Sequence, residues 1–218
     1  MQQPIVQPQN GIFVITGERI CAADIKASVA LFDSINDEEK ATYVEKLTVL
    51  SEQNNEIIFC AKHREEIIGT LVLLPMETSF LNEWCEGKHE SVFENLEFPA
   101  GIFRKYDIPG KYSLLFELLA VNPAYNRAEI IKNLMEAFGG KILEWARKSI
   151  FIEANYTEAY NREGERMAHF FGMEEVRKTT HGKIFKASAT PEKLIAMLPN
   201  SLNEYNQYYF DYFGTYRF

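Results

Sequence analysis

The feature of this sequence that most constrains its fold is an apolar strand followed by an amphipathic helix and a second strand. Residues 112–121 contain few polar side chains, which is typical of a buried central strand, and Asn122-Pro123 ends the run. Apolar side chains then recur at helical spacing over residues 128–148, and the β-branched and aromatic run 150–154 follows. Because strand–helix–strand connections within a sheet are parallel and right-handed, this segment predicts a parallel strand pair covered by a helix.

The rest of the chain predicts further strands and helices around that unit. Two apolar runs separated by a polar segment, 57–61 and 67–74, indicate an antiparallel hairpin. The other expected elements are strand 12–15, helices 21–35, 36–50 and 157–171, one or two strands within 176–187, and a partly helical insert at about 77–111. This order predicts a mixed α/β (α+β) fold, in which helices flank one sheet of parallel and antiparallel strands.

Composition narrows the classes of function. The 218 residues carry 23 Lys and Arg against 31 Asp and Glu, a net charge of −8, so a nucleic-acid partner bound by bulk charge is not expected. The most apolar stretch, 67–76, is too short to span a bilayer, and the N-terminus shows no secretory signal pattern. Three widely spaced cysteines favour a reducing compartment. The sequence therefore predicts a cytoplasmic protein with no membrane partner.

Two segments, together with the order of elements, resemble a known family. Residues 118–127 read Leu-Leu-Ala-Val-Asn-Pro-Ala-Tyr-Asn-Arg, and a helix is expected after them. Further along, Asn161 and Gly164 precede the run Met-Ala-His-Phe-Phe-Gly-Met at 167–173. These segments are similar to the Val-x-Pro strand end with its loop, and to the Asn-x-x-Ala-x-x-Phe-Tyr helix, of the Gcn5-related N-acetyltransferases. The resemblance implies that family's fold for a domain at residues 1–190.

The resemblance also implies where an acyl donor binds. In the family, the loop after the central strand cradles the pyrophosphate of coenzyme A at a helix N-terminus. Acetyl-CoA or another acyl-CoA is therefore the expected co-substrate. The positions that the resemblance implies for it are Leu119, Ala120, Val121, Asn126, Arg127, Ala128, Glu129, Ile130, Ile131 and Asn161.

Three of these positions depart from the family's loop pattern, Arg/Gln-x-x-Gly-x-Gly/Ala. Asn126 stands at the first position, Glu129 at the first glycine and Ile131 at the second. Glycines let backbone N–H groups approach phosphate oxygens, whereas a carboxylate at Glu129 would repel a pyrophosphate at the same helix end. Arg127 and Lys132 offset part of that repulsion. The departures leave open a donor such as acyl carrier protein, which presents pantetheine without the adenosine end.

Glu117 is the main catalytic candidate. It is the only acidic or basic residue between Lys111 and Arg127, and it shares one strand face with residues 115, 119 and 121. A carboxylate in an otherwise apolar strand is expected to have a raised pKa and to act as a general base for an amine. The alternative is a structural Glu117 paired with a Lys or Arg of the neighbouring strand.

His169 is the second catalytic candidate. The family position that usually holds the tyrosine general acid for the leaving thiolate is Ala168 here, and His169 lies next to it. The alternative is a histidine on the helix surface. The other histidines, His63, His89 and His181, are far apart and no pair has metal-ligand spacing, so no metal is expected.

The C-terminal segment contains an unusual share of aromatic residues. Of the chain's 16 Phe, 11 Tyr and 2 Trp, eight lie between Tyr205 and Phe218. One helical seam is formed by Leu202, Tyr205, Tyr209, Tyr212 and Tyr216. We expect residues 191–218 to form an extension that completes the core, joins a homodimer or lines a pocket for an acyl or aromatic substrate.

The sequence thus predicts an N-acyltransferase that moves an acyl group from acyl-CoA to an amine of a small molecule or peptide. Three alternatives stay open: an acyl-carrier-protein donor, a catalytically degenerate relative that serves as a binding or assembly module, and an unrelated α/β protein.

Overall fold

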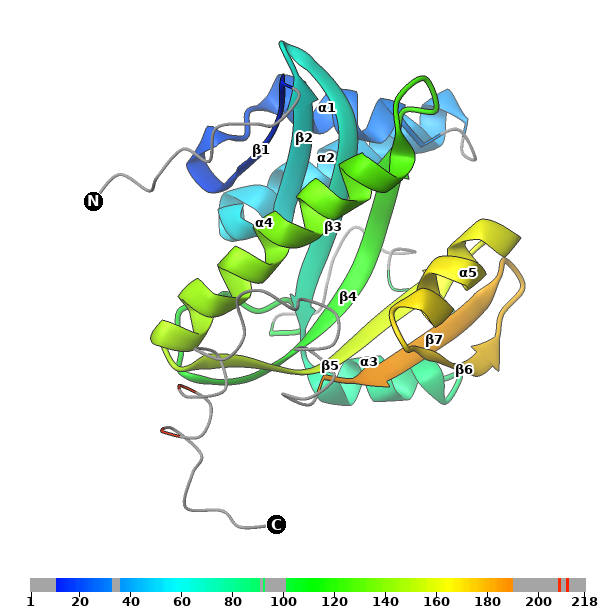
Figure 1. Ribbon diagram of the computed structural model, residues 1–218. Helices are drawn as coiled ribbons and strands as arrows, with labels where there is room; N and C mark the ends of the chain where they lie inside the picture. Colours follow the sequence, from blue (N-terminus) through cyan, green and yellow to red (C-terminus); the bar gives the residue numbers. More distant parts are fainter. Residues whose placement is uncertain are drawn as a thin grey trace. The chain divides into compact units, whose positions relative to one another are not determined.

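The computed structural model describes residues 11–32, 36–90, 92, 101–189, 208 and 211. Within them, hydrogen-bonded neighbours form a seven-stranded sheet in the order β1-β2-β3-β4-β5-β7-β6 (Figure 1). The helices are α1 (Ala22–Ala30), α2 (Asp37–Gln53), α3 (Thr78–Cys85), α4 (Arg127–Arg147) and α5 (Arg162–Phe170). The strands are β1 (Ile12–Thr16), β2 (Ile58–His63), β3 (Glu66–Met76), β4 (Gly110–Val121), β5 (Ile150–Ala159), β6 (Glu174–Lys178) and β7 (Lys183–Ser188). The mixed α/β class is confirmed.

The chain groups into two compact units. The first comprises Met1–Val72 and Leu118–Phe138, and the second comprises Leu73–Glu117 and Gly139–Phe218. Each unit has its own buried core and is described separately below.

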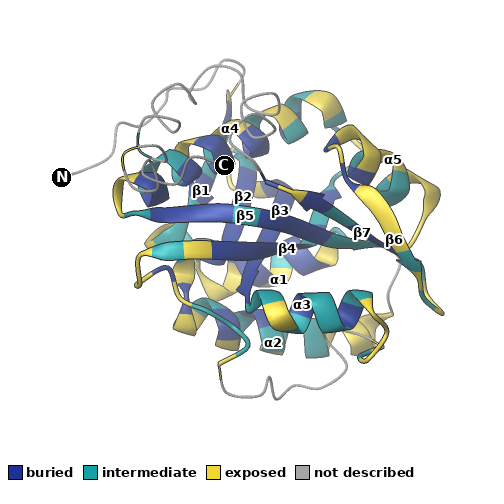
Figure 2. Ribbon diagram, turned by 90° about the horizontal axis from the view of Figure 1, so that it is seen from below, coloured by how far each residue is buried: buried dark blue, intermediate teal, exposed yellow. Residues whose placement is uncertain are grey.

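In the first unit, successive residues of β2 contact helices on opposite faces of the strand. The Phe59 ring packs edge-on against Phe138 of α4, with 6.1 Å between ring centroids. The next residue, Cys60, places its Sγ 3.2 Å from Oγ of Ser28 in α1. Because side chains alternate across a strand, this pair of contacts fixes α1 and α4 on opposite faces of the unit's sheet. In Figure 2 the ribbon of β2 and β3 is mostly dark blue, because most residues of these strands are buried.

Helix α4 packs very closely on β3 at Gly69. A Cβ added at Gly69 would overlap Cγ2 of Ile130, which is fully buried in the first turns of α4. Ile130 is β-branched and therefore stiff at χ1, so it could not move aside without strain. Gly69 thus sets the distance between helix and strand in this unit.

In the second unit, β4 and β5 form the parallel pair that the sequence predicts. Their register runs from Gly110 opposite Ile150 to Phe116 opposite Thr157. β5 then pairs antiparallel with β7, and β7 pairs antiparallel with β6. Figure 2 shows α3 and α5 on opposite faces of these strands. Residues 179–182 form the turn between β6 and β7, in which the Thr179 amide donates to the Gly182 carbonyl at 2.9 Å.

The end of β5 differs from the expectation. A helix was expected from residue 157, but β5 continues to Ala159 and α5 begins only at Arg162. Tyr156 and Thr157 are aromatic and β-branched residues that favour strands, and Tyr156 is fully buried. Asn161 then starts the helix as its N-cap, with its side chain accepting from two backbone amides. The predicted helix boundary was therefore wrong by more than one turn.

The insert expected at 77–111 contains α3. Its later residues pair antiparallel with the end of β3, at Met76 and Phe103. The Glu77 amide donates to the Ile102 carbonyl at 2.8 Å, and the Arg104 amide donates to the Pro75 carbonyl at 2.9 Å. The aromatic extension expected at 191–218 lies outside the described residues, apart from Tyr208 and Asp211. Its role, and the division at residue 190, stay predictions. Among the described helices, none is long and apolar enough to cross a membrane.

Candidate active site

Strands β4 and β5 of the second unit stop pairing before either strand ends. The last Cα partners are Phe116 and Thr157, although β4 continues to Val121 and β5 to Ala159. At this last pair, the Thr157 hydroxyl donates to the Phe116 carbonyl at 2.9 Å. Glu117 and Glu158 are the next residue of each strand. The point where parallel strands separate is a common ligand crevice in α/β sheets.

Both carboxylates belong to the strand faces that α3 covers. On β4, Ser113 bonds with Thr78 of α3 at 2.8 Å, and Glu117 lies four residues further along the same face. On β5, the Tyr156 hydroxyl donates to Asn82 of α3 at 3.0 Å, and Glu158 lies two residues further. The strand alternation therefore brings two acids from separate strands to one side of the sheet.

A hollow lies at this place. It is small, with about 10 Å³ of free volume, roughly the room that one water molecule needs. Its lining residues are Trp84, Val92, Leu115, Phe116, Glu117, Glu158 and Tyr160. Apart from the two carboxylates and the phenol, the lining is apolar or aromatic.

Two hydroxyl groups fix Glu158. One carboxylate oxygen accepts from Thr179 Oγ1 at 2.5 Å, and the other accepts from the Tyr160 phenol at 3.3 Å. Thr179 is itself oriented, because its oxygen accepts from the Gly182 amide at 2.8 Å. Within the described residues, Glu158 forms no ion pair with a lysine or arginine. Its charge is thus held by neutral donors.

The phenol of Tyr160 stays protonated beside these acids. Burial around the hydroxyl, the negative charges of Glu117 and Glu158 and the hydrogen bond to Glu158 all raise the pKa of Tyr160. Tyr160 as a residue is 46 % exposed, so the effect concerns the hydroxyl end rather than the whole ring. A phenol with a pKa above its ordinary value of about 10 is a poor proton donor to a thiolate, whose ordinary pKa is about 8.5. Tyr160 is therefore suited to hold Glu158 rather than to act as general acid.

The first unit contains the loop between β4 and α4. Asn122 accepts from the Ala124 amide at 3.0 Å and donates through its side chain to Glu66 at 3.1 Å. The Tyr125 hydroxyl donates to the other oxygen of Glu66 at 2.8 Å. Glu66 begins β3, so the hairpin of this unit fixes the course of the loop.

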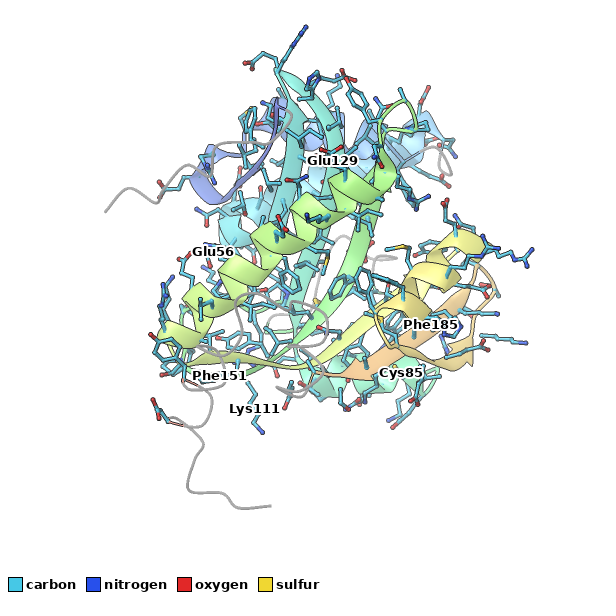
Figure 3. The ribbon with its side chains drawn as sticks, in the orientation of Figure 1. Glu56, Cys85, Lys111, Glu129, Phe151 and Phe185 are labelled. Carbon is cyan, nitrogen blue, oxygen red and sulfur yellow. The ribbon has the colours of Figure 1, made fainter. Side chains whose placement is uncertain are left out.

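The first turn of α4 is partly closed by its own side chains. Asn126 Oδ1 accepts from the Glu129 amide at 3.5 Å, and the Ile130 amide donates to the Asn126 carbonyl at 3.1 Å. Figure 3 shows Glu129 at this end of α4. Arg127 and Ile131 are half-buried here, and Ala128 is exposed. Ile130 is directed into the packing against Gly69 rather than toward solvent.

Comparisons with known proteins identify the architecture. No family model and no curated protein matches the sequence. Among solved structures, the chain is similar to a bacterial toxin with 13 % identity, over 87 % of this chain and 96 % of that one, at a TM-score of 0.52. It is also similar to a mutant form of the AtaT toxin, with 9 % identity over 90 % and 99 % of the two chains and a TM-score of 0.50. The mutant AtaT toxin bound to the C-terminus of the antitoxin AtaR and acetyl-CoA matches with 11 % identity, over 86 % and 98 %, at 0.48.

The chain has the Gcn5-related N-acetyltransferase fold. The resemblance read from the two sequence segments is thereby confirmed at the level of the fold. In this acetyltransferase fold, Leu119, Ala120 and Val121 form the end of β4 in the first unit, where Ala120 is buried and the other two are half-buried. Their assignment to a donor site stays a prediction.

The two candidates on α5 lie in different surroundings. Asn161 is the N-cap, and its Oδ1 accepts from the amides of Glu163 and Gly164 at 3.1 and 2.8 Å. His169 is exposed and packs edge-on against the Phe185 ring of β7, with 5.2 Å between centroids. The residues that line the hollow include Glu117 but not His169 or Asn161.

Sequence reasoning missed four residues that line the hollow with Glu117: Trp84, Val92, Glu158 and Tyr160. Glu158 and Tyr160 were placed in the helix expected at 157–171, whereas Glu158 belongs to β5 and Tyr160 directly follows it. Their spacing from Tyr156 has the period of two that marks one strand face. Trp84 lies in the insert, whose position relative to β4 no sequence pattern gave. In the described residues, no group of three or more His, Cys, Asp and Glu side chains is placed to hold a metal ion.

The cap geometry of Asn161 gives a testable result. Asn161→Ala is expected to lower the free energy of unfolding by about 1 kcal/mol, because two amides of α5 lose their acceptor. Asn161→Asp keeps an acceptor oxygen and is expected to retain the wild-type value. Urea denaturation of the three proteins measures this. An Asn161→Ala variant as stable as the wild type would show that the cap contributes nothing.

Proposed function

We propose that the protein is an N-acyltransferase that moves an acyl group from a thioester to a primary amine. The observation that carries this proposal is the placement of Glu117 and Glu158 where β4 and β5 separate, in a hollow of an acetyltransferase fold. The likeness of the protein's fold to acetyltransferases supports acyl transfer as the reaction class. The two carboxylates supply a proton acceptor, which an amine nucleophile requires.

Glu117 acts as the general base in this proposal. An amine enters mostly as the ammonium ion, which has no lone pair to attack with, so it must first lose a proton. The Glu117 carboxylate takes that proton directly or through one water molecule, and releases it to solvent after the reaction. Glu158 is held by Thr179 and Tyr160, so it is the fixed charge beside the base rather than the group that exchanges protons.

The thioester supplies an acyl carbon that the neutral amine attacks. A C–N bond forms, the C–S bond breaks, and the sulfur leaves as thiolate. The nitrogen loses its second proton as the amide forms, and the thiolate takes up one proton, so one proton is released overall from an ammonium substrate. Tyr160 is poorly suited to donate to the thiolate because its pKa is raised. His169 remains a candidate for that donor by resemblance alone.

The rate gain in this proposal comes mainly from placing amine and thioester together. Holding two reactants in attacking geometry removes most of the entropic cost of their meeting. Backbone N–H groups of the donor site are the proposed donors to the oxygen that becomes negative during attack.

The first turn of α4 fits the pyrophosphate of coenzyme A poorly. Glu129 brings a negative charge to the helix end, and Asn126 already accepts from the Glu129 amide. Arg127 is the nearest compensating charge in sequence. This favours, as a second candidate, a donor that presents pantetheine on a carrier protein and brings no adenosine diphosphate.

Ligand binding followed by acyl transfer tests the proposal. The full chain, mixed in turn with acetyl-CoA and with an acetylated acyl carrier protein, is examined by thermal shift and native mass spectrometry. Release of free thiol in the presence of an amine then measures transfer. Stabilisation and thiol release with acetyl-CoA support the first donor, and the same result only with carrier protein supports the second. Absence of binding and transfer with both would favour a catalytically degenerate binding or assembly module.

The charge at Glu129 has a predicted effect on donor affinity. Glu129→Gln keeps the side-chain shape and removes the charge at the helix end, so the Kd for coenzyme A is expected to fall about two- to fivefold. The gain should shrink as salt is added, because the repulsion is screened. Isothermal titration calorimetry measures the Kd of both proteins for coenzyme A at about 20 and about 500 mM salt. The screening length falls roughly fivefold over this range.

The control for Glu129→Gln lies further along the same helix. Glu136→Gln removes an exposed carboxylate of α4 that pairs with Lys132 at 3.8 Å. It is expected to change the Kd less than Glu129→Gln does, because Glu136 lies about two turns further from the helix end. Equal effects at both positions would assign the change to the overall charge of the helix and contradict a local role for Glu129.

A further inference from the structure

The end of the β2–β3 hairpin in the first unit contacts the loop between β4 and α4. His63 and Glu66 are the last paired residues of this hairpin, and the two-residue turn 64–65 joins them. Residues directly opposite each other in an antiparallel pair direct their side chains to the same face. Both therefore reach one loop residue, Tyr125. The His63 ring packs edge-on against the Tyr125 ring, with 5.6 Å between centroids, and Glu66 accepts from the Tyr125 hydroxyl at 2.8 Å.

Glu66 bonds to both ends of a tight turn in this loop. The turn runs from Asn122 to Tyr125, whose amide donates to the Asn122 carbonyl at 3.1 Å. One carboxylate oxygen of Glu66 accepts from the Asn122 side-chain amide at 3.1 Å, and the other accepts from the Tyr125 hydroxyl. The Asn122 backbone amide donates to the Ile68 carbonyl at 2.8 Å. Strand β3 thus holds the turn at its first residue through the backbone and at both ends through one side chain.

The turn leads directly into α4. Only Asn126 separates Tyr125 from Arg127, the first residue of the helix, and the Asn126 carbonyl accepts from the Ile130 amide at 3.1 Å. Because Ile130 is fully buried, the helix beyond its first turn is anchored by packing. The part of this region whose conformation depends on Glu66 is therefore the loop and the first turn of α4.

We propose that Glu66 is a positioning residue for the acyl donor, which holds the loop between β4 and α4 in the conformation that the donor binds. The inference rests on the proposed function, because the proposed donor site includes this loop. Without the two bonds to Glu66, the loop would populate other conformations as well. The apparent Kd for the donor then rises in inverse proportion to the fraction of molecules that remain competent to bind. Glu66 itself need not touch the donor.

The sign of the effect distinguishes positioning from a simple effect of charge. Coenzyme A is an anion, so removing a carboxylate that acts only through its charge would tighten binding, as is expected for Glu129→Gln. Glu66→Gln keeps the length of the side chain but leaves one oxygen to accept two bonds. Calorimetry is therefore expected to show coenzyme A binding about three- to tenfold more weakly to Glu66→Gln than to the wild type.

Glu65→Gln is the matched control. Glu65 is the exposed neighbour of Glu66 in the hairpin turn, so this variant removes the same charge from the same end of the hairpin. It leaves the bonds from Glu66 to the loop intact. The Kd for coenzyme A is expected to change less than about twofold, because solvent and salt screen an exposed charge. Circular dichroism checks that both variants are folded.

Titration of the Tyr125 phenol tests the contact with Glu66 without any donor. The hydrogen bond to Glu66 is the largest cause that raises the pKa of Tyr125 above its ordinary value. NMR spectra of ring-labelled tyrosine, in which Tyr125→Phe identifies the signal, are expected to show this pKa falling in Glu66→Gln and unchanged in Glu65→Gln. Tyr125→Phe also removes one of the two bonds without a change of charge, so it too is expected to weaken coenzyme A binding.

The outcomes separate this inference from the proposed function. If Glu66→Gln binds coenzyme A as tightly as the wild type or more tightly, the inference is overturned and acyl transfer is unaffected. Weaker binding by both Glu66→Gln and Tyr125→Phe, without thiol release by the wild type, would uphold the inference and contradict the acyltransferase. Where transfer occurs, Glu66→Gln is expected to raise the KM for acetyl-CoA and to leave kcat nearly unchanged, whereas a loss in kcat alone would contradict a positioning role. If the wild type binds only acetylated carrier protein, the same comparison with that donor decides.

Discussion

Glu117→Gln is expected to lower kcat/KM for acyl transfer to an amine by roughly 10²- to 10⁴-fold near neutral pH. The amide of glutamine has nearly the shape of the carboxylate but cannot accept a proton, so attack is limited to the small fraction of amine that enters neutral. Glu117 lines the hollow at the first position of β4 beyond its pairing with β5, which places it beside the proposed acceptor.

The pH dependence of the same variant is a sharper measurement. In the wild type, kcat/KM is expected to fall on the acidic side as the base becomes protonated. In Glu117→Gln this step is missing, and the rate should instead follow the fraction of neutral amine up to alkaline pH. Glu153→Gln serves as the control with unchanged activity. A Glu117→Gln variant with the wild-type rate and pH profile would remove Glu117 from the mechanism.

Gly182→Ala is expected to have the largest effect on stability, lowering the free energy of unfolding by about 1–3 kcal/mol. A Cβ at Gly182 would overlap the carbonyl oxygen of Ala159 and lie 3.1 Å from Cα of Tyr160. The obstacle is backbone, so the end of β5 must move. The Gly182 amide also orients Thr179, which holds Glu158, so the Glu158 carboxylate is expected to lose its fixed position as well.

Gly140→Ala provides the matched control for Gly182→Ala. Gly140 lies inside α4, and nothing lies within 4 Å of a Cβ placed there. Alanine favours the helix and restricts the unfolded chain, so a gain of about 0.5–1 kcal/mol is expected. Urea denaturation compares both variants with the wild type. Similar losses at the two glycines would contradict the close contact at Gly182.

Local patterns were enough to predict most elements of the fold. Helix α4 was predicted through its two central glycines, because the apolar stripe stays in phase on both sides of them. The start of α2 was also predicted correctly at residue 36, since Asn36 is its N-cap and accepts from the Glu39 amide at 2.9 Å. In both cases the information lies within a few residues of the chain.

The candidate site was predicted only in part, because its residues are brought together by tertiary contacts. Glu117 could be singled out as an acid in an apolar strand. Glu158 and Tyr160 could not, since the length of β5 depends on its pairing with β7, where Glu158 lies opposite Ile184. Trp84 enters the hollow from α3, and no periodicity in the sequence links α3 to the ends of β4 and β5.

The closely packed glycines offer a means of recognising relatives of this chain. A sequence profile weighted on glycines of the phosphate loop would reject it, because Glu129 and Ile131 occupy those positions. Gly69 is required by the contact of β3 with Ile130 of α4, and Gly182 by its contact with the end of β5, whatever donor the protein uses. A profile that weights these two glycines together with Glu117 and Glu158 would therefore collect sequences with the same architecture and sort them by acceptor chemistry instead of by donor loop.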